Sequence, residues 1–377
     1  MNGWSLDPEG IFLNHGSFGA CPTDILGEQQ RLRSALETSP VPFTLERLPL
    51  LLERARRETA SFFGADPSRF LFVKNATTGV NTVLAGLDPT GGKELLLTSY
   101  GYPACGKAVE RWWCGRGGTV RVVDLPLPPP SDAHLIELIV AGVRDTTEVV
   151  LLDHITSSTA VCLPLEEICA KVSRPGLTLL VDGAHAPGTV PLDLEALGRC
   201  GVTFYTGNLH KWCCSPKGAA FLWANPAMKM ELHPLVTSHG WQAGLHSEFD
   251  WTGTDDPTAW LVVPACLKWL AEQREGGWPE IRTECRSLLE YGMEEVASAL
   301  GVQVMGRGTP FMESLELPYK LYHPQLRSSL WREHRIDIHV EAPTQNYPPI
   351  LRLSAFLYNR ASDYRRLADL FRHLLRP

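Results

Sequence analysis

The sequence predicts an α/β fold in which helices sandwich a mainly parallel central sheet, joined to a smaller α+β domain. Three observations support this prediction. Short β-branched or leucine-rich runs alternate with amphipathic stretches from about residue 69 to residue 225, as in a parallel sheet covered on both faces. After Pro257 the pattern changes to longer helical stretches with a few strand-like runs. The 377 residues are enough for two structural units.

The elements of the larger unit can be placed in chain order. Two helical stretches come first, at 23–36 and 45–63. Runs with the composition of buried strands follow at 70–73, 94–98, 119–123, 148–152, 178–181 and 219–223. Helical patterns separate several of these runs, at 104–113, 134–143 and 165–172.

The smaller unit is expected to mix helices and strands. Helices are predicted up to Leu270, over 279–300 and up to about His373, with strands at 302–305, 337–340 and 350–353. We therefore divide the chain into an N-terminal arm (1–22), a large domain (23–260) and a small domain (261–377). The helices within 23–63 are candidates to pack with the small domain.

Composition and charge restrict the class of partner. The formal net charge of −7 argues against a nucleic-acid or anionic-membrane surface. No apolar run approaches the roughly 20 residues that cross a bilayer, and the N-terminal residues lack the pattern of a signal peptide. The ten cysteines include no Cys-x-x-Cys pair, as expected for reduced thiols. We expect a cytoplasmic protein whose partners are small molecules, without nucleic acid or membrane.

Polar residues follow the predicted strands at the points where the strands end. Ligands of doubly wound sheets bind at the carboxyl ends of the strands. Asp182 begins an Asp-Gly-Ala-His run after one strand, and a buried acid there is costly unless a cation or hydrogen-bond donor meets it. Lys211 belongs to a His-Lys pair that precedes a Pro-Lys-Gly turn.

A candidate anion site lies at the start of a helix. Thr77 and Thr78 follow the first strand of the sheet and open a helical stretch, where hydroxyls and backbone N–H groups attract an anion. Taken singly, these features also have structural interpretations. Thr77 could be an ordinary N-cap residue, Asp182 a helix cap and His185 a core histidine.

The order and spacing of these motifs resemble the class V aminotransferase branch of the fold-type I pyridoxal 5'-phosphate (PLP) enzymes. The resemblance runs from about residue 11 to residue 375, and the loop 13–19 resembles the entrance loop of the isopenicillin N epimerase-like members. It implies a fold-type I PLP-transferase fold, PLP as cofactor, an amino-acid substrate and a homodimer with shared active sites.

The resemblance also implies roles for individual residues in holding the cofactor. Lys211 is expected to form the Schiff base, Asp182 to pair with the ring nitrogen and His185 to lie beside the phenolic oxygen. Further cofactor contacts are expected from Thr77, Thr78, Tyr102, Ser157, Asn208, His210 and, across a subunit boundary, Thr254.

Three residues are expected to bind the substrate. Arg352 lies in a segment that resembles the family's Arg-x-Ser motif, whose arginine binds a substrate carboxylate with its planar fork. Asn14 and His15 belong to the entrance loop. No metal site is predicted, because the pair His246 and Asp250 supplies too few ligands for zinc.

The resemblance leaves the reaction open. The entrance loop favours an epimerase or racemase, and a C–S lyase acting on a cysteine conjugate, an aminotransferase and a non-catalytic PLP-binding scaffold are the alternatives. The last cysteine is Cys285, which argues against the persulfide cysteine that family desulfurases carry near the carboxylate arginine. Epimerisation needs a second acid, for which Tyr102 and His15 are the candidates.

Overall fold

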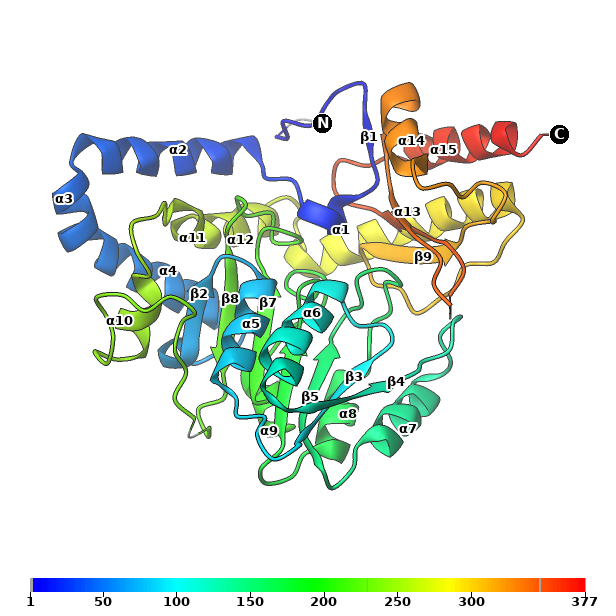
Figure 1. Cartoon of the computed structure of the whole chain (residues 1–377). Coiled ribbons are helices and arrows are strands. Elements are labelled where there is room, and N and C mark those ends of the chain that lie inside the picture. Colours follow the sequence, from blue (N-terminus) through cyan, green and yellow to red (C-terminus); the bar gives the residue numbers. More distant parts are fainter. Residues whose placement is uncertain (1–2, 229, 346, 377) are drawn as a thin grey trace.

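A seven-stranded sheet stands at the centre of the computed structural model, which describes residues 3–228, 230–345 and 347–376 (Figure 1). In spatial order its strands are β2 (Phe70–Val73), β8 (Ala220–Ala224), β7 (Phe204–Asn208), β6 (Thr178–Asp182), β5 (Thr147–Asp153), β3 (Glu94–Thr98) and β4 (Thr119–Val123). Pairing is parallel from β4 to β7, and β8 runs antiparallel to both of its neighbours. The predicted mainly parallel sheet is confirmed. Residues 1 and 2 of the predicted arm lie outside the described residues.

Helices cover both faces of this sheet, which explains why its strands are apolar at nearly every position. Along β8, Phe221 and Trp223 face one hydrophobic cluster, while Ala220 and Leu222 face another. The first cluster is completed by α7 (Asp132–Gly142), α8 (Leu165–Val172) and α9 (Leu194–Arg199). The second is completed by α5 (Ala76–Gly86) and α6 (Pro103–Trp112). A strand buried on both faces needs apolar side chains on both.

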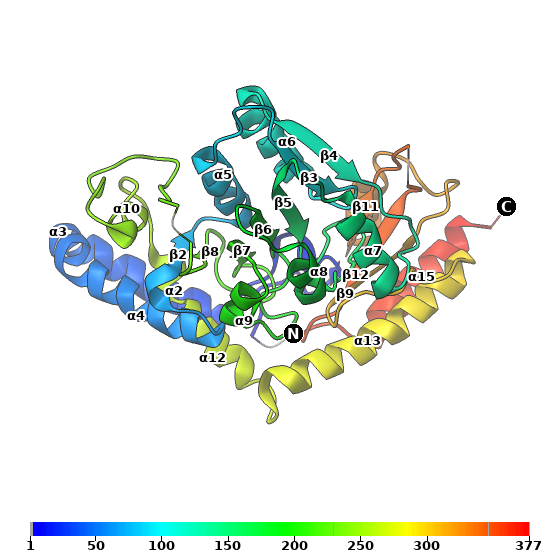
Figure 2. The same cartoon turned by 90° about the horizontal axis from the view of Figure 1, so that it is seen from below.

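The C-terminal part contains an antiparallel sheet of three strands within the described residues. Their order is β11 (His339–Glu341), β12 (Ile350–Ser354) and β9 (Met312–Glu316). The long helix α13 (Gly277–Leu300) packs against α15 (Ala361–Leu374) and runs beneath the two sheets in the view of Figure 2. The predicted smaller α+β unit is thus present, with α14 (Leu326–His334) preceding β10 (Ile336–Asp337).

The N-terminal arm is tied to this C-terminal part, because β1 (Ile11–Phe12) pairs in parallel with β10. The helices α2 (Thr23–Thr38) and α4 (Leu48–Phe62) instead contact α11 (Thr258–Leu261). Helix α4 also contacts α12 (Val263–Ala271) and the edge strand β2. The predicted domain boundary falls inside α11, and the division into domains stays a prediction.

The remaining helical segments are short. They are α1 (His15–Phe18), α3 (Pro40–Pro42), η1 (Phe43–Arg47), η2 (Pro67–Arg69), η3 (Cys114–Arg116) and α10 (Leu245–Asp250). Across the described ranges, no helix has both the length and the apolar character needed to cross a membrane.

Three strands, β1, β7 and β9, were not predicted, and one predicted strand is absent. β7 contains Gly207 and Asn208, which disfavour strands, and β9 contains the buried carboxylate of Glu313. In the predicted strand 302–305, Val304 forms only an isolated bridge. These elements are determined by neighbouring chain segments rather than by their own composition.

Candidate active site

A cavity of about 440 Å³ lies at the carboxyl ends of the parallel strands. The segments that follow β2, β3, β5, β6 and β7 all contribute to its lining, as in other doubly wound sheets. The predicted site residues that line it are Thr77, Tyr102, Ser157, Asp182, His185, Asn208, His210 and Lys211. The fold therefore gathers most of the predicted cofactor-binding side chains in one place.

The side chain of Lys211 is partly buried and lies beside His185. Its Nζ lies 2.9 Å from His185 Nε2, and the indole N–H of Trp212 donates to His185 Nδ1 at 3.4 Å. Because an indole nitrogen can only donate, the neutral His185 ring carries its proton on Nε2. Burial, together with the charge of Arg352, lowers the pKa of Lys211 to about 7. A substantial fraction of the amine is therefore uncharged near neutral pH.

Asp182 ends β6 with both carboxylate oxygens engaged. Its Oδ1 accepts a hydrogen bond from the Ala184 N–H at 3.0 Å, and its Oδ2 accepts one from the Cys105 thiol at 3.1 Å. Burial raises the pKa of Asp182, while these two donors and the nearby Lys211 lower it. Because each oxygen has a further lone pair, the carboxylate can still accept from a ligand in the cavity.

Asp153 is a second buried carboxyl group in the cavity lining. It ends β5 and is the register partner of Asp182 on β6. Burial and the neighbouring Asp182 raise the pKa of Asp153 well above its ordinary value, which favours its protonated form. Sequence reasoning missed this residue, although it directly follows a predicted strand and the rule that identified Asp182 applies to it.

The N-terminus of α5 forms the candidate phosphate site. Asn75 caps the helix by accepting from the Thr78 N–H at 2.8 Å, and Asn208 accepts from the Ala76 N–H at 2.8 Å. Thr77 lines the cavity, whereas the Thr78 hydroxyl donates to Asn75 at 3.0 Å. Asn208 thus contributes by fixing the helix start, and the helix end itself attracts an anion.

His210 lines the cavity in a defined tautomer. Its Nδ1 lies 3.1 Å from the carbonyl oxygen of Ala219 and donates to it, which leaves Nε2 without a proton in the neutral ring. Burial lowers the pKa of His210 to about 4. His210 can donate to a phosphate only if the phosphate charge draws a proton onto the ring.

Arg352 brings a buried cation from β12, with a side chain only 2% exposed. Its Nη1 donates to the carbonyl and hydroxyl oxygens of Ser157, and its Nη2 donates to the Ser17 hydroxyl at 3.2 Å and to Asn14 Oδ1 at 3.4 Å. Burial lowers the pKa of Arg352 to about 10. These four hydrogen bonds go to neutral groups, while the charge of the nearby Glu341 carboxylate counters the effect of burial on Arg352.

Asn14 and His15 support the site from behind rather than lining the cavity. The Asn14 amide donates to Asp337 at 3.0 Å, while its oxygen accepts from Arg352. The ring of His15 stacks against those of Trp212 and Phe356. Its Nδ1 lies 2.6 Å from the Tyr358 hydroxyl, and its Nε2 lies 3.0 Å from the Lys211 carbonyl oxygen. With both nitrogens engaged, His15 positions the Lys211 backbone. The predicted contacts of Asn14 and His15 with the substrate stay predictions.

Thr254 lies in an adjoining cavity of about 370 Å³, which Thr78 and Lys74 also line. Lys74 forms an ion pair with Asp255 beside it. The predicted contact between Thr254 and the phosphate of a neighbouring subunit concerns a second chain and stays a prediction.

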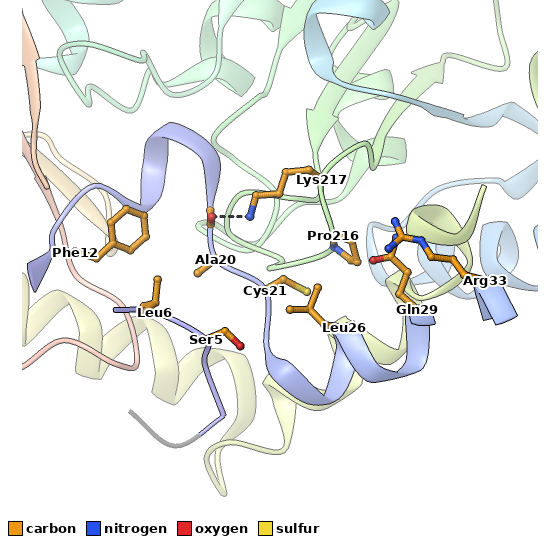
Figure 3. A pocket seen from close by; sticks show the side chains of 11 residues that line it. Ser5, Leu6, Phe12, Ala20, Cys21, Leu26, Gln29, Arg33, Pro216 and Lys217 are labelled. Atoms are coloured by element: carbon orange, nitrogen blue, oxygen red, sulfur yellow. Dashed lines mark hydrogen bonds between the residues drawn. The ribbon is translucent and has the colours of Figure 1, made fainter. Parts of the chain in front are cut away.

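Lys217 was not predicted, although it belongs to the Pro-Lys-Gly turn. It lines both the main cavity and a further cavity of about 360 Å³ (Figure 3). Its Nζ donates to the carbonyl oxygen of Gly19 at 2.8 Å, the dashed contact in Figure 3. The N-terminal segment is thus fastened beside Lys211 and separates the two cavities.

These side chains fit pyridoxal phosphate. A partly buried amine with a lowered pKa suits its aldehyde, a buried carboxylate suits its ring nitrogen, and a helix N-terminus suits its phosphate. Within residues 3–228, 230–345 and 347–376, no group of three or more His, Cys, Asp and Glu side chains is arranged to hold a metal ion.

Comparison with known proteins agrees with this chemistry. The family described as Aminotransferase class-V matches residues 42–367. Isopenicillin N epimerase of Streptomyces clavuligerus is 31% identical over 97% of this chain and 94% of its own length. A probable chloroplastic L-cysteine desulfhydrase of Arabidopsis thaliana is 30% identical over 98% of this chain and 84% of its own length.

The fold also matches a solved structure. A mutant of C-DES with glycine covalently linked to its PLP cofactor has a TM-score of 0.83, with 23% identity, over 97% of each chain. At this identity the match shows the fold, which is that of the fold-type I PLP enzymes. The chain therefore belongs to the class V aminotransferase family and is a PLP-dependent enzyme.

Proposed function

We propose that this protein is an amino-acid epimerase or racemase that acts at the α-carbon through a Schiff base on Lys211. The observation that carries this proposal is the placement of the partly buried Lys211 amine, whose pKa is lowered to about 7, in one cavity with Asp182 and close to the buried guanidinium of Arg352. Resemblance to the isopenicillin N epimerases over nearly the full length supports the choice of reaction.

Each group would perform a separate task. When bound, PLP supplies a conjugated ring that accepts the electron pair left at the α-carbon. The uncharged Lys211 amine takes the α-proton as a general base. Asp182 would keep the ring nitrogen protonated, and the Nε2–H of His185 would donate to the phenolic oxygen. Arg352 fixes the substrate carboxylate with its two-pronged fork.

Inversion at the α-carbon also needs an acid on the side opposite Lys211. We propose the hydroxyl of Tyr102 for this role. The side chain is 40% exposed and lines the cavity from the N-cap of α6. Burial raises the pKa of Tyr102, so the hydroxyl holds its proton and can donate it.

A C–S lyase acting on a cysteine conjugate is the second candidate. The resemblance to a cysteine desulfhydrase supports it. Cys285, the last cysteine of the chain, is buried on α13. A lyase of this kind would therefore release its sulfur fragment directly, without forming a persulfide on a protein thiol.

Incubation of the PLP-loaded protein with single amino acids in heavy water separates these reactions. Deuterium at the α-carbon with loss of chirality is the result expected for the epimerase. Pyruvate and ammonia from a cysteine conjugate would indicate the lyase, and a keto acid formed with conversion of the cofactor to its amine form would indicate transamination. Absence of α-proton exchange with every amino acid would leave a PLP-binding scaffold.

We further propose a cytoplasmic homodimer in which each subunit contributes Thr254 to its neighbour's phosphate site. All ten cysteines are free thiols, which suits a reducing compartment. Leu45 and Leu50 project from the N-terminal helices with exposed fractions of 71% and 72%, and a second copy would cover them.

A further inference from the structure

The thiol of Cys105 is a buried group that the roles above do not use. Cys105 lies in the first turn of α6, and its Sγ approaches Asp182 Oδ2 to 3.1 Å. Tyr102, the N-cap residue of the same helix, lines the cavity. The start of α6 therefore directs the ring of Tyr102 towards the cavity and the thiol of Cys105 towards the carboxylate of Asp182.

Asp182 needs such a donor because a second acid competes with it for the negative charge. Asp153 is its register partner on the adjacent strand, and both carboxyl groups are buried. Two neighbouring buried carboxylates cannot both ionise readily, so the hydrogen-bond donors that each one meets decide which keeps the charge. Backbone N–H groups, including that of Tyr102, serve Asp153. Asp182 accepts from the Ala184 N–H and from the Cys105 thiol.

Cys105 is suited to donate rather than to ionise. Burial, followed by the charge of Asp182, raises the pKa of the thiol well above its ordinary value. The thiol thus keeps its proton, and Asp182 Oδ2 receives it as a hydrogen bond. A nucleophilic thiol would need the opposite environment.

We propose that Cys105 is a positioning residue that holds Asp182 ionised and oriented, so that Asp182 keeps the cofactor ring nitrogen protonated. This inference rests on the proposed pairing of Asp182 with that nitrogen. The thiol acts through Asp182 and does not itself touch the substrate.

The test compares Cys105→Ala, which removes the donor, with Cys105→Ser, which retains one. The readouts are the dissociation constant of PLP from the cofactor-free protein and the ¹⁵N chemical shift of ring-labelled PLP in the loaded protein, which reports protonation of the ring nitrogen. We expect Cys105→Ala to bind PLP at least about fivefold more weakly and to shift the ¹⁵N signal towards the unprotonated position. Cys105→Ser should restore the wild-type signal.

Cys169 provides a matched control, because it is an equally buried thiol on α8. Cys169→Ala should lower the unfolding temperature by a similar amount while leaving the ¹⁵N shift and PLP affinity unchanged. If Cys105→Ala does not fold, Cys105→Val serves as the variant without a donor. Wild-type values in the variant without a donor, or the same loss in Cys169→Ala, would overturn the proposal.

The variant Asp182→Asn distinguishes a failure of the inference about Cys105 from a failure of the proposed role of Asp182. If Asp182→Asn loses ring protonation and Cys105→Ala does not, the inference about Cys105 fails and the role of Asp182 stands. If Asp182→Asn keeps the nitrogen protonated, the proposed role of Asp182 fails, and the inference about Cys105 fails with it.

Discussion

Lys211 carries an amine whose charge is decided by its position in the fold. An ordinary lysine has a pKa near 10.5, but burial and the positive charge of Arg352 lower that of Lys211 to about 7. A protonated amine has no lone pair with which to attack an aldehyde. The cofactor-free protein should therefore capture PLP at a rate that follows the uncharged fraction of this one side chain.

We expect that rate to rise about tenfold per pH unit below pH 7 and to become flat above about pH 8. Stopped-flow absorbance of PLP mixed with cofactor-free protein measures it. Lys211→Ala should show no covalent capture, whereas Lys268→Ala, which removes an exposed lysine, should keep the wild-type profile. A rate that continues to rise up to pH 10 would show that the Lys211 amine is not the perturbed group described here.

Arg352→Leu should weaken substrate binding while leaving PLP binding intact. Loss of a desolvated, charge-assisted contact costs about 1.5–3 kcal/mol, so the KM for the amino acid should rise on the order of 10- to 100-fold. Steady-state kinetics and PLP titration give the two quantities. Arg54→Leu, which removes an exposed arginine, is the control. An unchanged KM in Arg352→Leu would place the substrate carboxylate elsewhere.

The sequence could predict Asp182 because it directly follows a strand-like run, and Lys211 because its His-Lys pair resembles a motif of the family. Cys105 could not be assigned in this way, since its contact with Asp182 depends on how α6 lies against the sheet. The same holds for His15, whose ring is held by Trp212 and Tyr358, far away in the sequence. Local pattern identifies groups at the carboxyl edge, whereas tertiary packing decides which of them reach the cavity.

At the scale of elements, the N-terminal segment depends on one glycine. Gly19 has a φ of +70°, and a Cβ there would lie 2.0 Å from the His210 carbonyl oxygen. The segment can pack against the backbone beside Lys211 only because this Cβ is missing. In contrast, Gly27 lies within α2 with no heavy atom within 4 Å of the position that a Cβ would take.

Gly19→Ala and Gly27→Ala should therefore have opposite effects on stability. Gly19→Ala should lower the free energy of unfolding by about 1–3 kcal/mol through backbone strain and reduce activity. Gly27→Ala should raise it by about 0.5–1 kcal/mol, because alanine restricts the unfolded chain and suits a helix. Denaturant titration of both variants provides the comparison. Equal effects would mean that the segment moves aside without cost.

The strands that could be predicted are those whose own residues favour a buried strand. β7 could not be predicted, because Gly207 weakens its strand pattern. Glycine is nevertheless required there, since an added Cβ at Gly207 would lie 2.6 Å from Pro187 and 2.8 Å from Phe221. Glu313 in β9 is similarly polar in sequence but is buried and paired with Arg286. In both strands, a contact with a distant segment overrides local propensity.

At the scale of the whole molecule, the exposed apolar side chains of the N-terminal helices predict a dimer. The double variant Leu45→Glu with Leu50→Glu should be monomeric, because charges there oppose burial against a second copy. Size-exclusion chromatography with light scattering measures the mass. Activity should fall in parallel, since Thr254 would no longer reach its neighbour. Leu374→Glu, on α15, should remain dimeric, and a dimeric double variant would place the interface elsewhere.

The pairing of β1 with β10 also affects when the enzyme can mature. The ring of His15 donates from Nε2 to the Lys211 carbonyl oxygen and accepts at Nδ1 from the Tyr358 hydroxyl. Its backbone N–H donates to the Ser354 hydroxyl, and Leu13 forms backbone hydrogen bonds with residues 337 and 354. Residues 11–15 therefore cannot reach their final positions until residues 336–358 have been synthesised and folded. Capture of the cofactor should accordingly follow folding of β10 and β12.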